Sequence, residues 1–97
     1  MNPELLEPLK TVIDPELGIN IVDLGLVYAA ERTNGCIAIA LTMTTPACPL
    51  SEMMIQEIKG VLEVQFPDTS VQVDLVWDPP WSPDLMTEAS RRQLGMP

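Results

Sequence analysis

Cys48 is the residue in this sequence best placed for chemistry. It precedes Pro49, which is suited to the first position of a helix, so Cys48 is expected to be the N-cap residue. The unpaired amides and the positive dipole end of a helix favour a thiolate, which predicts a lowered pKa and a nucleophilic sulfur. Thr44 and Thr45 would bring hydroxyls to the same place. The alternative is a buried cysteine that merely fills its space.

A second group of candidates is acidic. Asp14 and Glu16 lie in a turn that contains a proline and a glycine, and Asp23 follows in the same stretch of chain. Carboxylates around such a turn could bind a metal or transfer protons, and they could equally accept hydrogen bonds from their own backbone. The spacing alone favours the backbone role.

Two tryptophans flank a proline pair. Trp77 and Trp81 lie on either side of Asp78-Pro79-Pro80. Aromatic side chains beside prolines either form a rigid lid on a core or present a docking face to a partner protein. Both interpretations stay open from the sequence.

The cysteine and histidine inventory limits the possible site chemistry. The chain has two cysteines and no histidine, so it cannot readily close a four-ligand zinc site or form a Cys-His nucleophilic pair. Cys36 and Cys48 are not spaced as a CxxC pair, and two free thiols are expected in a cytoplasmic protein. A thiol enzyme in which Cys36 resolves an oxidised Cys48 is a further hypothesis, which the missing histidine argues against.

Length and charge set the class of protein. The 97 residues, 46% of them hydrophobic, are expected to form one domain over residues 1–97. The net charge of −9 would repel phosphate backbones and anionic lipids, which makes nucleic acid and membranes unlikely partners. No apolar run reaches the roughly 20 residues of a membrane span, and the N-terminus lacks the features of a signal peptide. A cytoplasmic location is therefore expected.

Periodicity predicts the elements that would position these residues. Helical spacing indicates a helix over residues 2–13, with Pro8 either kinking it or beginning it after Glu7 as the cap. Residues 14–18 read as a turn, and residues 19–25 as a short strand or extended loop. Alternation predicts strands over residues 26–32 and 36–44, joined by a hairpin turn at residues 33–35.

The second half of the chain continues the pattern. An amphipathic helix is expected over residues 49–66, a strand over 70–77, and a last helix over 83–93 with Ser82 as its cap. The order is α-β-β-α-β-α. It predicts an α+β fold, a two-layer sandwich in which helices pack mainly on one face of a small mixed sheet.

Three motifs carry a resemblance to a known family. They are DPELGINIVDLG at residues 14–25, LTMTTPACP at residues 41–49 and VWDPPWSP at residues 76–83. In this order they resemble the small metal-sulfur cluster biosynthesis domain, an iron-sulfur cluster assembly family once filed as a domain of unknown function. SufT-like and PaaD-like proteins are branches of it, and the chain is more similar to a stand-alone SufT-like member.

The resemblance implies an accessory role in iron-sulfur cluster assembly or delivery, with client enzymes and assembly proteins as partners. The reactive cysteine of the family falls on Cys48, and further site positions fall on Asp14, Glu16, Thr44 and Thr45. No tightly bound cofactor is implied, only a transient iron-sulfur cluster. One cysteine cannot hold a cluster alone, which motivates the prediction of a homodimer presenting two such sites.

The runner-up hypothesis is a non-catalytic adaptor. In that case Asp23, Trp77 and Trp81 would bind partner proteins, and Cys48 would be dispensable. Both hypotheses make the chain an accessory protein more readily than an enzyme.

Overall fold

The computed structural model describes residues 2–44 and 51–95 of the chain. Its elements, in order, are α1 (Pro3–Leu9), β1 (Val27–Thr33), β2 (Cys36–Leu41), α2 (Ser51–Gln65), β3 (Ser70–Leu75), a short 3-10 turn (Pro83–Leu85) and α3 (Glu88–Gln93). The predicted order of helices and strands and the α+β class are confirmed.

The sheet is mixed, with strand order β1-β2-β3. β1 and β2 are antiparallel and joined by a tight turn, in which Asn34 and Gly35 take positive φ values of 29° and 77°. Such a turn matches the twist of the two strands and explains the Asn-Gly pair. β2 and β3 are parallel, and α2 is the crossover between them.

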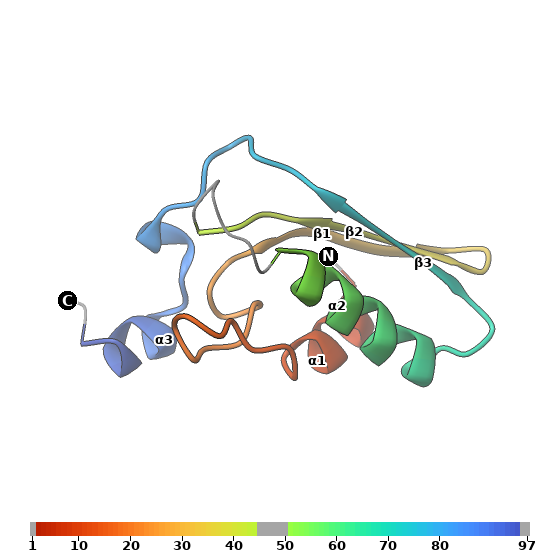
Figure 1. Cartoon of the computed structure of the whole chain (residues 1–97), viewed down its shortest axis with the longest axis horizontal. Coiled ribbons are helices and arrows are strands. Elements are labelled where there is room, and N and C mark those ends of the chain that lie inside the picture. Colours follow the sequence, from red (N-terminus) through yellow and green to blue (C-terminus); the bar gives the residue numbers. More distant parts are fainter. Residues whose placement is uncertain (1, 45–50, 96–97) are drawn as a thin grey trace.

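The core lies between the sheet and the two helices beneath it (Figure 1). Alternate β2 residues are buried on this side, while Ala38 on the other face is exposed. α1 and α2 contribute a stripe of apolar side chains each, at the helical spacing that the sequence shows. The fully buried residues of these three elements are Leu5, Leu9, Ile37, Ile39, Leu41, Met54, Ile58 and Leu62.

Helix α1 begins near its predicted start but ends earlier than predicted. It begins at Pro3, with the Asn2 side chain accepting a hydrogen bond from the amide of Glu4 at 2.9 Å, so a start at Pro8 is wrong. Pro8 lies in the last turn and the helix ends at Leu9 instead of residue 13. The chain can then turn early, and Ile13 pairs with Asn20 in an isolated antiparallel bridge.

The last predicted helix is divided in two. The 3-10 turn Pro83–Leu85 ends at Met86, whose backbone is extended, and α3 begins after Thr87 as N-cap. The extended residue lets the Thr87 amide reach the carbonyl of Asp23 at 2.9 Å, a tertiary bond that a continuous helix would not allow. None of the described helices is long and apolar enough to cross a membrane.

Candidate functional site

A pocket of about 380 Å³ lies where the chain leaves the C-terminal end of β2. It is lined by Met43, Thr44, Trp77, Pro80 and Trp81. The structure therefore brings together one predicted threonine and both predicted tryptophans, from segments more than thirty residues apart in sequence. Thr45 and Cys48, the other predicted residues of this segment, lie outside the described residues.

The two tryptophans have different environments. The indole Nε1 of Trp81 donates a hydrogen bond to the carbonyl of Leu24 at 2.6 Å, and its ring packs against the core. Trp77 is 43% exposed, which is a large apolar surface for one side chain. Trp81 thus fixes the wall of the pocket, and Trp77 offers apolar surface to solvent at its rim.

Tyr28 ties the proline segment to β1, a role that sequence reasoning missed. Its hydroxyl donates to the carbonyl of Pro79 at 2.8 Å. The preceding peptide bond, between Asp78 and Pro79, is cis. A single tyrosine in a strand gives no sequence signal for such a contact, because the partner is a backbone atom far along the chain.

Thr42 is a buried residue with an unusual hydroxyl. Its amide donates to the carbonyl of Leu26 at 2.8 Å, but its Oγ1 has no hydrogen-bond partner among the described residues. A buried hydroxyl without a partner costs about 1 to 3 kcal/mol. The sequence places Thr42 on the small-residue face of the strand but does not predict its burial.

Asp14 uses its carboxylate to organise the turn that follows it. The side chain is buried, with 4% of the residue exposed, and Oδ1 accepts from the amides of Glu16 and Leu17 at 2.8 and 3.2 Å. The Gly18 amide donates to the Asp14 carbonyl at 2.8 Å. Glu16 lies at the surface. Neither acidic residue lines the pocket at the end of β2.

Asp23 holds the C-terminal helix against the loop. Its Oδ2 accepts from the Asn20 side chain at 3.0 Å. Its carbonyl accepts from the Thr87 amide at 2.9 Å and from the Ser90 hydroxyl at 3.1 Å. Oδ2 and the carbonyl of Asp23 are thus engaged within the chain, and a role in partner binding stays a prediction.

The described residues give no ready metal site. Within residues 2–44 and 51–95, no three Cys, Asp or Glu side chains lie close enough together to hold a metal ion. Cys36 is a free thiol at the start of β2. Cys36 and Leu41 are five positions apart along the strand, about 16 Å, so Cys36 lies at the end of the strand opposite the pocket.

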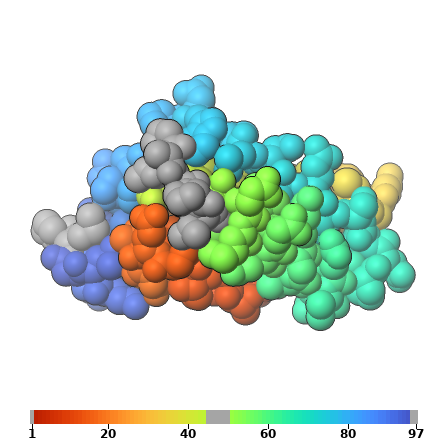
Figure 2. All heavy atoms as spheres, viewed as in Figure 1, coloured from red at the N-terminus to blue at the C-terminus, as the bar shows by residue number. Residues whose placement is uncertain are grey.

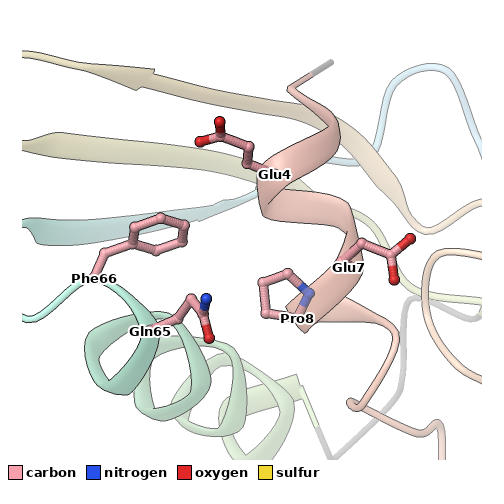
Figure 3. A pocket seen from close by; sticks show the side chains of 5 residues that line it. All are labelled: Glu4, Glu7, Pro8, Gln65 and Phe66. Atoms are coloured by element: carbon pink, nitrogen blue, oxygen red, sulfur yellow. The ribbon is translucent and has the colours of Figure 1, made fainter.

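A second hollow, between α1 and the end of α2, has two glutamates among its lining residues (Figure 3). It is lined by Glu4, Glu7, Pro8, Gln65 and Phe66. Glu4 pairs with Arg32 at 3.7 Å and Glu7 with Lys10 at 3.5 Å, both at the surface. Both carboxylates of this hollow therefore already have cationic partners.

Comparisons with known proteins agree on one family. The family model described as iron-sulfur cluster assembly protein matches residues 3–91. The Fe-S protein maturation auxiliary factor SufT of Staphylococcus aureus is 40% identical over 87 residues, covering 88% of this chain and 98% of that protein. An iron-sulfur cluster carrier protein of Deinococcus radiodurans is 39% identical over 62 residues, covering 64% of this chain and 18% of that protein.

A solved structure has the same fold. A domain of unknown function from Bacillus anthracis superimposes with a TM-score of 0.90 at 38% identity, covering 97% of this chain and 91% of that one. The three motifs at residues 14–25, 41–49 and 76–83 all lie within the matched region.

Proposed function

The chain belongs to the iron-sulfur cluster assembly protein family, and from this premise we propose that it matures client proteins through a reactive thiolate at Cys48. An accessory role in iron-sulfur assembly follows from the family. The proposal adds that Cys48 is the residue that performs this role. Its main support is the match over residues 3–91, which includes the segment with Cys48.

The pocket at the end of β2 suits such a role. Its apolar walls would exclude water from a sulfur-bound cargo, and Thr44 would offer one hydroxyl as a hydrogen-bond donor to sulfide or thiolate. Asp14 would act indirectly, because its carboxylate fixes the turn that contains Glu16. Glu16 and Thr45 are proposed to complete the polar surface around Cys48.

The cluster is cargo in this proposal. One cysteine leaves most iron positions of a cluster without a protein ligand. The remaining ligands would come from cysteines of the client, from a small thiol, or from Cys48 of a second copy. We propose that a homodimer forms while the cluster is held. Light scattering after size exclusion should detect it, and a monomer with and without cluster would contradict it.

The test is cluster uptake. Anaerobic reconstitution with iron and sulfide should give the visible absorption of an iron-sulfur cluster in the wild type and not in Cys48→Ser. Cys36→Ser is the matched control, because it also removes one thiol, and the Cys36 thiol is partly exposed at the start of β2. Equal uptake by all three proteins would overturn the role of Cys48.

The second candidate is an adaptor, favoured by the exposed indole of Trp77. Here the pocket walls would bind assembly proteins or client enzymes directly, and Cys48 would be dispensable. Trp77→Ala should then abolish client binding, while Cys48→Ser leaves client maturation unchanged. Loss of maturation only in Cys48→Ser would exclude the adaptor.

A further inference from the structure

The two edge strands of the sheet differ in how well they are protected from pairing with another strand. The edge of β1 carries an irregularity in its pairing between Val27 and Ala29, and the amide of Asn2 donates to the carbonyl of Ala30 at 2.9 Å. Bulges and covering segments of this kind keep other strands from pairing with an edge. The β1 edge is therefore partly closed by the chain itself.

The edge of β3 has no such protection within the described residues. β3 pairs with β2 without interruption over all six residues and contains no proline or lysine. The amides of Ser70 and Val76 donate to β2 or its turn at 2.9 and 2.8 Å, so the alternating residues between them face the other way. The backbone groups of Val71, Val73 and Leu75 therefore point out of the sheet.

The residues that carry these backbone groups are partly exposed. In Figure 2 the residues of β3, coloured turquoise to cyan, lie on the surface of the molecule above α2. The side chains of Val71, Val73 and Leu75 are only half buried, which leaves apolar surface beside the open edge. A strand added here would satisfy the backbone groups and cover that surface with its own apolar side chains.

The charge around this edge indicates what kind of strand would bind there. Residues 66–82, which include β3 and the chain on either side of it, contain three acidic and no basic residues. Asp68, Asp74 and Asp78 are exposed just before, within and just after β3, and none forms an ion pair with a described residue. The Gln72 side chain donates to both oxygens of Asp74 at 3.3 Å. Because Gln72 is neutral, the negative charge of Asp74 stays uncompensated. A cationic strand fits this edge.

We propose that β3 is a docking edge for an extended segment of a partner protein in which basic and apolar residues alternate. Its apolar side chains face α2, and its basic side chains face Asp74 on the open side of the sheet. A second copy of the chain is disfavoured, because it would bring two acidic edges together in a protein of net charge −9. The proposal does not depend on Cys48.

The test uses a capped heptapeptide of alternating lysine and valine, and a glutamate-valine peptide as its control. The lysine peptide should slow amide exchange at Val71, Val73 and Leu75, and the glutamate peptide should not. Val73→Pro removes the backbone amide of residue 73, which points away from β2 and would bond the added strand. The hydrogen bonds to β2 remain, and peptide binding should weaken roughly tenfold. Unfolding curves check that this variant folds.

The charge variants keep the test decisive if Val73→Pro fails to fold. Asp74→Lys should weaken the lysine peptide at least about threefold and bind the glutamate peptide better, in low salt. Glu57→Lys makes the same change in net charge on an exposed position of α2 and should change neither affinity. Protection at β1, no protection at millimolar peptide, or self-association through β3 would each overturn the proposal.

Discussion

The two ends of β2 are built in different ways. At the site end, residues 42–44, long-range side-chain bonds tie the surrounding segments together, such as Trp81 to Leu24 and Tyr28 to Pro79. At the hairpin end, residues 34–36, the long-range bonds are those of Ser70 to the carbonyl of Gly35. The hairpin end therefore combines local turn chemistry with bonds to the neighbouring strand, whereas the contacts at the site end hold together segments that the strands alone would not join.

The largest expected loss of stability distinguishes the two tryptophans of the site end. Trp81→Ala removes a packed ring and leaves the Leu24 carbonyl without its donor, so it should lower the free energy of unfolding by about 3 to 4 kcal/mol. Trp77→Ala, at an exposed position, should cost less than about 1 kcal/mol. Urea denaturation measures both. Equal losses would mean that Trp77 is also a structural anchor.

Substitutions at two glycines allow a direct comparison of the two ends of β2. Gly25 and Gly35 both have positive φ, at 76° and 77°, so alanine is strained at either position. A Cβ at Gly25 would lie 2.4 Å from the Leu85 carbonyl oxygen, and one at Gly35 would meet nothing within 4 Å.

Gly25→Ala should therefore cost about 2 to 3 kcal/mol and Gly35→Ala about 1 kcal/mol in thermal or urea unfolding. The difference measures the close approach at the site end. If both cost the same, the loop before β1 can move away from Leu85 freely, and the site end is less rigid than its contacts indicate.

A smaller effect of opposite sign is expected at Thr42. Thr42→Val keeps the shape and removes a buried hydroxyl without a partner among the described residues, so stability should rise by about 1 kcal/mol. Thr69→Val is the control, because the Thr69 hydroxyl donates to the Phe66 carbonyl at 2.6 Å, and its loss should cost about 1 kcal/mol. A destabilised Thr42→Val would show that its hydroxyl is satisfied in solution.

The sequence predicted the regular elements better than the site. Alternation in β2 and the Asn34-Gly35 turn specified the hairpin, and helical spacing specified α2, because these signals are local and periodic. The bonds of Trp81 and Tyr28 to distant carbonyls have no periodic signature. The start of α3 was missed for the same reason, since the bond from Thr87 to Asp23 decides it.

The predicted site residues divide along the same line. Thr44, Trp77 and Trp81 meet in one pocket, which their sequence separation did not reveal. Asp14 has the backbone role that its turn composition favoured. For Thr45 and Cys48, outside the described residues, the prediction rests on the sequence and the family.

Cluster transfer to an apo acceptor enzyme tests the central claim most directly. The acceptor is activated anaerobically by protein reconstituted with iron and sulfide, and wild type, Cys36→Ser and Cys48→Ser are compared. We predict that Cys36→Ser activates the acceptor at the wild-type rate. Cys48→Ser should activate it no faster than free iron and sulfide do. Equal activation by both variants would contradict chemistry at the site end and leave the adaptor as the better account.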